Sequence, residues 1–523
     1  MKKNIFPVFI IVCLSFQILL AQNKSFNETG LIYLRSNLEV LASDQFEGRE
    51  TATKGEQLAA LFISKELTKY GVKPFGEDGT YFQFFDLLVR TVEPETELTI
   101  INSNGTSKVF KLGDDIYFSK EQVPSYKYSG NKSDIVFAGY GITTEDYNYN
   151  DYNGLDVKGK VVLLQSGAPV IDDEGFSAKD EKRFDDRNYK IKNAKDHGAT
   201  GVLIIPGGKL LRYWPFIKKK ALSPAVSLMN ADKEDKNEIP VAILSEESVK
   251  HLLSDENYSY DEILDASENG KSISGFDLTK KIVFNYKFNV EIKQGRNVLG
   301  IIDGNDDQLK NEYVVLTAHY DHEGIVGGEI FNGADDNGSG TVAILEAGRR
   351  LALLKNNKRS VLIVFHAGEE KGLLGSEYLT KNSAFMGEVV TSINVDMVGR
   401  EDTESIYSIG SGKLSTELYE LVEKVNSETV RFQLDYTFDE PNDPNRYYYR
   451  SDHYNYAKQN IPIVFFYDHM TEDYHKPTDD VDKINFEKLE KISTLITELA
   501  LRVANLDHRL KVDNPLEEIS GPK

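Results

Sequence analysis

Short apolar runs alternate with segments of helical period through the C-terminal half of the chain. The apolar runs are Val314–Thr317, Ser360–Phe365, Ser392–Val395 and Ile463–Phe466. Their short length and apolar character are typical of strands buried at the centre of a sheet. Thr341–Leu354 and Phe486–Val503 repeat their apolar residues with the period of a helix. This alternation predicts an α/β sandwich with a mostly parallel central sheet over residues 286–509.

Two further regions precede this one, and a polar tail, 510–523, follows it. The region 22–124 opens with two helical patterns, Leu31–Ala42 and Gly55–Tyr70, and continues with strand-like segments such as Glu97–Ile101. The region 125–285 is β-rich, and Gly139 and Gly141 mark a turn in it. Its predicted strands are Ile135–Tyr140, Lys160–Gln165, Gly201–Ile205 and Val241–Leu244, with a helix near Asn188–His197.

The first residues have the layout of a secretory signal peptide. Lys2 and Lys3 precede a mostly apolar run, Ile5–Leu20, and the small residue Ala21 follows it. We expect cleavage after Ala21 and export to the periplasm or the extracellular space. A membrane anchor is the alternative, but the run is short for a span and contains Pro7 and Gln17. No later stretch is apolar for long enough to cross a bilayer, so no stable membrane insertion is expected after cleavage.

Composition narrows the class of protein. The chain has 523 residues, which is long for one domain. Hydrophobic residues make up 40% of it and charged residues 28%, a composition that is ordinary for a globular protein. The formal net charge of −22 argues against nucleic acid or an anionic membrane as the main partner, because both favour a basic surface.

Metal-binding residue types recur directly after the predicted strands. His319 follows Val314–Thr317, Glu369 and Glu370 follow Ser360–Phe365, Asp396 closes Ser392–Val395, and His475 lies in the loop after Ile463–Phe466. Asp336 lies in a Gly/Asn-rich turn that opens the helix beginning near Thr341. In sheets of this kind, ligands gather at the loops beyond the strand ends.

These residue types suit zinc. Zinc binds imidazole nitrogen and carboxylate oxygen where cysteine is absent. Two His, two Asp and one Glu could hold two ions if one carboxylate bridges them. A second carboxylate beside a ligand, as in Glu369-Glu370, could take a proton from a metal-bound water.

Each of these residues and turns, taken alone, is compatible with a purely structural role. A single histidine such as His319 is more often structural, and paired acids are usually solvated surface. The turn Gly333–Gly340 could be a capped helix start, or a phosphate loop, although it lacks the lysine of that motif. The recurrence of the same residue types after successive strands favours a metal site.

Five segments resemble the signature blocks of the co-catalytic zinc aminopeptidases, peptidase family M28, which also includes glutamate carboxypeptidases and glutaminyl cyclases. They are Ala318–Asp321, Asn332–Gly340, Gly368–Ser376, Asn394–Gly399 and Tyr474–Asp479, in the family's order. The likeness covers the third region closely, and the first more loosely through Leu41–Arg49. It implies a three-layer sandwich with a mixed, largely parallel sheet.

The resemblance also implies roles for single residues. His319 and Glu370 would each bind one zinc ion, Asp396 and His475 would be the other terminal ligands, and Asp336 would bridge the two ions. Asp335 is less suited, because the family's ligand is the fourth residue of the Gly-Ala-x-Asp block. Glu369 would be the general base, Asp321 would orient the His319 imidazole, and Tyr474 would donate to the oxyanion.

The middle region resembles a protease-associated domain. Ile135–Ile142, Leu155–Leu164 and Lys192–Ile205 carry this likeness. In such relatives the domain is an insertion, so we expect a discontinuous catalytic domain in which 22–124 packs on 286–509. The inserted domain usually carries no catalytic residue.

Other polar residues are given non-catalytic roles. Ser451-Asp452-His453 could suggest a catalytic triad, but three consecutive residues do not normally converge on one proton path. We interpret them as a wall or support of the pocket. His366, on a strand just before the paired glutamates, is interpreted as structural.

The preferred hypothesis is an exported aminopeptidase acting on peptides with two zinc ions per chain. A carboxypeptidase or dipeptidase is the first alternative, and it would need cationic groups to hold a carboxylate. Arg400, Arg446 and Arg450 are candidates by sequence position. Glutaminyl cyclases use one zinc and have generally lost the first histidine. Binding proteins such as the transferrin-receptor ectodomain have lost ligands, whereas all five are present here.

Overall fold

The computed structural model describes residues 29–118, 128–130, 132–169, 176–229, 239–269, 271–400, 402–440 and 443–515. The predicted signal peptide, 1–21, and the end of the polar tail, 516–523, lie outside these residues. The chain forms two compact units. Residues 1–87 and 293–523 form one, the discontinuous unit, and residues 88–292 form the other, the inserted unit.

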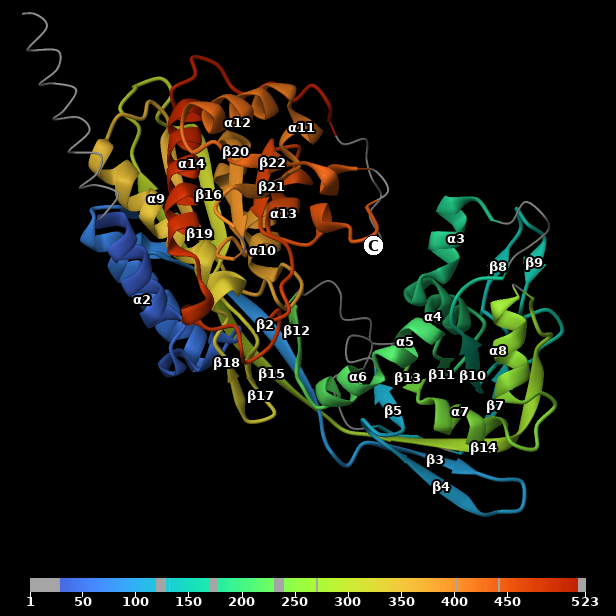
Figure 1. Ribbon diagram of the computed structural model, residues 1–523. Helices are drawn as coiled ribbons and strands as arrows, with labels where there is room; N and C mark the ends of the chain where they lie inside the picture. Colours follow the sequence, from blue (N-terminus) through green and yellow to red (C-terminus); the bar gives the residue numbers. More distant parts are fainter. Residues whose placement is uncertain are drawn as a thin grey trace, which may run out of the picture. The chain divides into compact units, whose positions relative to one another are not determined.

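A mixed sheet runs through the centre of the discontinuous unit (Figure 1). Its order in this unit is β2-β15-β19-β16-β20-β23-β21-β22, and β1 pairs with β15. The pairs β16–β19, β16–β20, β20–β23 and β21–β22 are parallel, whereas β15–β19 and β21–β23 are antiparallel. The strands are β1 Lys73–Pro74, β2 Phe82–Val92, β15 Phe288–Ile302, β16 Tyr313–His319, β19 Ser360–His366, β20 Val389–Asp396, β21 Ser405–Ile409, β22 Gln433–Asp435 and β23 Ile463–Tyr467.

Helices cover both faces of this sheet (Figure 1). On one face α9 (Gly340–Leu354) and α14 (Phe486–Ala504) pack against each other and against β16 and β20, and α2 (Lys54–Lys69) packs on α9. On the other face α13 (His453–Ala457) packs against β20 and β23, beside α10 (Leu374–Asn382). Residues 29–41 are also helical, as are α11 Ser411–Leu414 and α12 Thr416–Glu428, and β17 Gly324–Val326 and β18 Glu329–Phe331 form a small hairpin.

Local sequence explains why these elements form where they do. The four central strands β16, β19, β20 and β23 are buried along almost their whole length, which requires their apolar composition. In α14 the side chain of Asn485 caps the N-terminus by accepting from the Lys488 amide, and Leu489, Ile492, Ile496 and Leu499 form its buried stripe. The predicted α/β sandwich with a largely parallel sheet is confirmed.

The inserted unit has its own sheet, in the order β4-β3-β14-β7-β10-β11-β13-β5, with β6 paired to β14. The strands of this sheet are β3 Glu97–Ile101, β4 Ser107–Lys111, β5 Ile116–Phe118, β6 Tyr128–Ser129, β7 Ser133–Phe137, β10 Val161–Gln165, β11 Gly201–Ile205, β13 Val241–Leu244 and β14 Phe276–Tyr286. Outside it, β8 Thr143–Thr144 and β9 Tyr149–Asn150 pair with each other, and β12 is Ala225–Leu228. Its helices are α3 Ala178–Asp185, α4 Arg187–Asp196, α5 Gly208–Arg212, α6 Trp214–Lys220, α7 Glu246–Leu253 and α8 Tyr260–Glu268.

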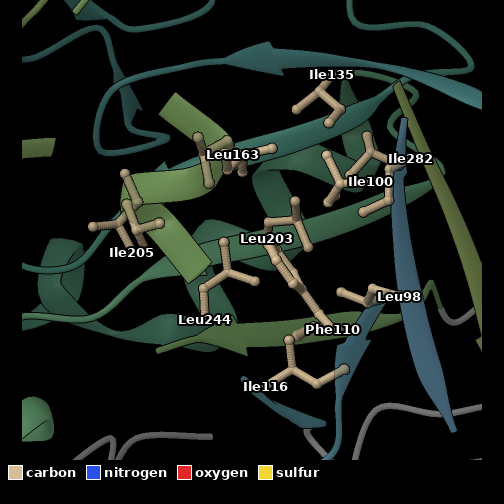
Figure 2. Packing of buried hydrophobic residues seen from close by; sticks show 14 of the residues in the cluster. Leu98, Ile100, Phe110, Ile116, Ile135, Leu163, Leu203, Ile205, Leu244 and Ile282 are labelled. Atoms are coloured by element: carbon tan, nitrogen blue, oxygen red, sulfur yellow. The ribbon is translucent and has the colours of Figure 1, made fainter. Parts of the chain in front are cut away.

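Aliphatic side chains from most strands of this sheet meet in one core. Figure 2 shows Ile100 of β3 beside Ile282 of β14, and Leu98, Leu163 and Leu203 in the same cluster, and all five are fully buried. Because β3 pairs with both β4 and β14, residues 97–111 fold with the inserted unit. The region 125–285, which the sequence predicted to be β-rich, supplies most strands of this sheet.

Among the described residues, no helix combines the length and the apolar composition needed to cross a membrane.

Candidate metal centre

The predicted metal-binding residues lie at one edge of the central sheet of the discontinuous unit. His319 is the last residue of β16 and Asp396 is the last residue of β20, and Glu369-Glu370 and His475 lie in the loops after β19 and β23. These four strands are parallel neighbours, so their carboxyl ends share an edge. Asp336 joins them from the turn Ala334–Ser339, which leads into α9.

Asp336 stands between two halves of the site. Its Oδ1 lies 3.6 Å from His319 Nε2, and its Oδ2 lies 3.2 Å from His475 Nε2. On one side His319 Nε2 is 3.2 Å from Asp396 Oδ1. On the other, His475 Nε2 is 3.0 Å from Glu370 Oε2. The structure thus brings all five predicted ligands together, with one carboxylate shared.

Two residues not expected from the sequence belong to the same cluster. His322 Nδ1 lies 2.9 Å from Glu370 Oε1 and 3.8 Å from Asp336 Oδ2. Glu323 Oε1 lies 3.3 Å from His475 Nδ1. Both residues follow directly after Ala318–Asp321. The one feature of the sequence that could have indicated them is a second histidine three residues after His319.

The donor set fits metal ions. Three groups of side chains could each hold an ion: His319, Asp336 and Asp396; His322, Asp336 and Glu370; and Glu323, Glu370 and His475. Within the described part of the chain, the buried Nε2 atom of His322 has no hydrogen-bond partner, and buried polar atoms are rarely left so. Imidazole and carboxylate donors without cysteine are the chemistry that zinc accepts.

The two adjacent glutamates differ in their electrostatic surroundings. Burial, reinforced by Glu370 and Asp396 against the opposing effect of His319, raises the pKa of Glu369 well above its usual value. Burial also acts to raise the pKa of Glu370, but His475 and the hydrogen bond from His322 lower it well below the usual value. Neighbouring carboxyl groups whose pKa values are driven apart are typical of sites in which they have different roles.

Asp321 contacts both His319 and Glu369. Its backbone carbonyl lies 3.2 Å from His319 Nδ1, whereas its carboxylate Oδ1 is 3.8 Å from that nitrogen. The same Oδ1 accepts a hydrogen bond from the Glu369 amide at 3.2 Å, and Oδ2 accepts one from Thr51 Oγ1 at 2.6 Å. Asp321 therefore fixes the position of the backbone at Glu369 as well as the ring of His319.

Buried polar side chains hold the loops that carry the ligands. The Asp479 carboxylate accepts hydrogen bonds from the backbone amides of Asp335 and Asp336, and Arg400 donates to it at 2.6 Å. Arg400 also donates to Asp473 at 3.0 Å, so its guanidinium is engaged within the fold. Asp335 accepts from the Gly399 amide instead of facing the cluster.

The predicted roles of the other polar residues can be compared with their contacts. Ser451 Oγ donates to Asp396 Oδ2 at 2.8 Å, whereas His453 Nε2 bonds to the carbonyl of Tyr448. The residues Ser451–His453 therefore support the site without forming a triad. His366 is fully buried between Asn297 and Tyr456, as expected of a structural histidine.

A pocket with an empty volume of about 350 Å³ opens onto the cluster. Tyr474 is part of its wall, and its ring stacks on His475 with the ring centres 3.8 Å apart. The lining residues are Asp336, Glu369, Glu370, Asp396, Met397, Tyr447, Arg450, Phe465, Tyr467 and Tyr474.

Comparisons with known proteins agree with the sequence motifs. Residues 297–500 match the model of peptidase family M28, and residues 131–252 match the model of the PA domain. A "Probable leucine aminopeptidase" of Arthroderma benhamiae is 31% identical over 185 residues, which are 33% of this chain and 48% of that protein. The chain thus spans about half the length of this curated relative.

Solved structures share the fold across both units. An aminopeptidase from Aneurinibacillus sp. strain AM-1 matches with a TM-score of 0.59 and 18% identity, covering 92% of this chain and 96% of that one. A zinc aminopeptidase from Bacillus subtilis matches with a TM-score of 0.51 and 20% identity, covering 90% and 94%. At these identities the likeness concerns the fold. Together with the two family models, it confirms the expected resemblance.

Proposed function

Residues 297–500 belong to peptidase family M28, and from this premise we propose that the protein is a zinc-dependent aminopeptidase. The observation that carries the proposal is the meeting of His319, Asp336, Glu370, Asp396 and His475 from five separate segments, with Asp336 shared between two histidines 3.6 and 3.2 Å away. The relatives named aminopeptidases, one of them a zinc enzyme by its title, support the same activity.

Two zinc ions per chain are proposed. His319 and Asp396 would bind one ion, Glu370 and His475 would bind the other, and Asp336 would bridge them. The close approach of each pair, 3.2 Å for His319 and Asp396 and 3.0 Å for His475 and Glu370, supports this division. Bound zinc would supply Lewis-acid chemistry, lowering the pKa of a water molecule and polarising a carbonyl group.

Glu369 is proposed as the general base. Its carboxylate lines the pocket and lies 4.0 Å from His319 Nε2, while the Asp321 carboxylate holds its backbone amide. Glu369 takes a proton from water as the water oxygen attacks the scissile carbonyl carbon. It then delivers that proton to the amine nitrogen as the C–N bond breaks.

The substrate is held by the other pocket residues. The acidic lining attracts the free α-amino group of a peptide, and the Tyr474 hydroxyl is suited to donate to the oxyanion of the tetrahedral intermediate. Met397 and Phe465 give the same pocket an apolar wall that suits an apolar side chain. An acyltransferase of the cyclase type and a non-enzymatic binding protein are less favoured, because the complete ligand set is present.

We propose that the protein is exported. The basic start, the apolar run and Ala21 at the N-terminus support this proposal.

The test is Glu369→Gln, which keeps the shape of the side chain and removes its basicity. Turnover of a peptide with a free amino terminus should fall by a factor of about 10²–10⁴, while the zinc content stays at two ions per chain. Glu404→Gln is the matched control, because the Glu404 side chain is 78% exposed, and it should leave both quantities unchanged. Near-normal turnover of Glu369→Gln with zinc fully bound would exclude Glu369 as the base.

A further inference from the structure

Arg450 gives the acidic pocket a guanidinium group. The lining contains the carboxylates of Asp336, Glu369, Glu370 and Asp396, and Arg450 is the one basic residue among the described residues that line it. Its guanidinium lies over the ring of Tyr447, 5.1 Å from the ring centre, and Tyr447 also lines the pocket. A guanidinium stacked on a buried ring is held in place more firmly than one at the end of a free chain.

The Arg450 guanidinium lies over an aromatic ring but forms no ion pair with a carboxylate of the described residues. In the part of the chain that the structure describes, no carboxylate oxygen lies within 4.0 Å of its guanidinium nitrogens, and the residue is exposed. Arg400 differs, because its guanidinium is bound to Asp473 and Asp479. Arg446 differs in another way, because it stacks on Tyr449, which is not among the pocket-lining residues.

The pocket therefore offers negative groups and a positive group to the same ligand. A zwitterionic ligand, with an ammonium group among the carboxylates and a carboxylate at the guanidinium, matches this distribution of charge. Arginine binds carboxylates through two parallel hydrogen bonds, which adds geometric selectivity.

We propose that Arg450 binds a carboxylate of the substrate, and that the enzyme consequently favours short peptides that carry a carboxylate close to the cleaved bond. This inference rests on the proposed aminopeptidase function. The carboxylate has two sources in such substrates: the C-terminus of a dipeptide, or the side chain of an acidic second residue. Arg450 is thus a specificity-determining residue, and it takes no part in the proton transfers.

The experiment compares three substrates that share an N-terminal leucine. Leucylglycine has a free C-terminal carboxylate, leucylglycinamide has none, and the α-amide of leucylaspartate has only a side-chain carboxylate. In the wild-type protein, kcat/KM should be higher for at least one carboxylate substrate than for leucylglycinamide. Arg450→Gln should lower kcat/KM for that substrate by about tenfold or more, mainly through KM, and leave leucylglycinamide within about twofold.

Two variants accompany Arg450→Gln. Arg450→Lys keeps the charge but lacks the planar fork, so it should recover part of the lost activity. Arg446→Gln is the matched control, because it removes an exposed guanidinium outside the pocket, and it should behave as the wild type. Zinc content and circular dichroism of each variant identify any that fail to fold.

The outcomes separate the possibilities. A selective loss for leucylglycine assigns the C-terminal carboxylate, and a selective loss for the leucylaspartate amide assigns the side chain. An equal loss for all three substrates, or no loss for either carboxylate substrate, would overturn the inference while leaving the aminopeptidase function intact. If the wild type cleaves none of the three, the proposed function itself fails.

Discussion

Glu369 and Glu370 are neighbours in the chain, yet their surroundings drive the pKa values of the two carboxyl groups in opposite directions. Two imidazoles face Glu370, whereas Glu369 is buried beside other carboxylates. The Asp321 carboxylate holds the backbone just before this pair by accepting from the Glu369 amide. This hydrogen bond holds the backbone at Glu369, and both glutamates line the pocket.

His322 supports the Glu370 carboxylate, and its replacement tests this role. In His322→Gln the contact of 2.9 Å between His322 Nδ1 and Glu370 Oε1 would be altered. Residues that orient metal ligands typically contribute a factor of about 10–100 to metal affinity. We expect zinc affinity, measured by competition with a chromophoric chelator, to weaken by that factor for one ion only.

A surface histidine provides the comparison. His508 has a side chain that is 61% exposed and pairs with Glu417, far along the chain from the cluster, so His508→Gln should bind both ions as the wild type does. Unchanged affinity in His322→Gln would mean that Glu370 is held without the imidazole.

The sequence could predict some residues of this site and not others. The sequence could predict the five ligand candidates because each follows a strand or opens a helix. They are His319, Asp336, Glu370, Asp396 and His475. His322 could not be predicted, because a second histidine in a loop carries no period or spacing rule. The hydrogen bond from Thr51 to Asp321 could not be predicted either, because the two residues are far apart in the chain and only folding brings them together.

At the scale of elements, one buried arginine joins the N-terminal segment to two loops of the site. Arg49 is fully buried and donates to the backbone carbonyls of Tyr320, Asn332 and Gly333, at 2.8, 2.6 and 2.9 Å, and to that of Leu41 at 2.9 Å. The loop after β16 and the turn before α9 are therefore fixed to the segment Asp44–Arg49.

Arg49→Ala should destabilise the discontinuous unit. It leaves several buried carbonyls without a donor, and each such group costs about 1–3 kcal/mol. We expect the thermal midpoint of this unit to fall by about 5 °C or more, and zinc affinity to fall with it, in differential scanning calorimetry and chelator competition.

Arg35→Ala is the matched control for this change. Arg35 lies over the ring of Phe486, 4.0 Å from its centre, and is an exposed residue, so its loss should move the midpoint by only about 1 °C. If Arg49→Ala lowered the thermal midpoint no more than Arg35→Ala does, the backbone carbonyls would have to be hydrogen-bonded to other donors in the variant.

Element type was predictable from apolar pattern, whereas pairing was not. The runs Val314–Thr317 and Ile463–Phe466 correspond to β16 and β23, because a strand buried on both faces must be apolar throughout. Glu97–Ile101 was recognisable as a strand, but its partner in β14 includes Ile282, far away in the chain. Local pattern carries no information on such pairing, so the membership of β3 in the inserted unit emerged only from the structure.

At the scale of the whole molecule, the metal centre concentrates negative charge in a chain that is already acidic, with a formal net charge of −22. Asp336, Glu369, Glu370 and Asp396 line one pocket, and their mutual repulsion opposes folding. Bound divalent cations would offset this repulsion. Metal binding should therefore stabilise the discontinuous unit.

Removal of zinc tests this coupling. Chelation followed by dialysis should lower the thermal midpoint of the discontinuous unit by about 5 °C or more and abolish peptide hydrolysis, and zinc should restore both. The inserted unit is an internal control, because the candidate metal groups found among the described residues all belong to the discontinuous unit. Equal shifts in both transitions, or none, would count against a structural role of the metal.

The most direct test is an anomalous difference map from crystals of the zinc-loaded protein, with data collected on both sides of the zinc absorption edge. We expect two peaks, one between His319 and Asp396 and one between Glu370 and His475, with Asp336 in contact with both. A map with no zinc peak among these side chains, or with a single peak that Asp336 does not contact, would contradict this expectation.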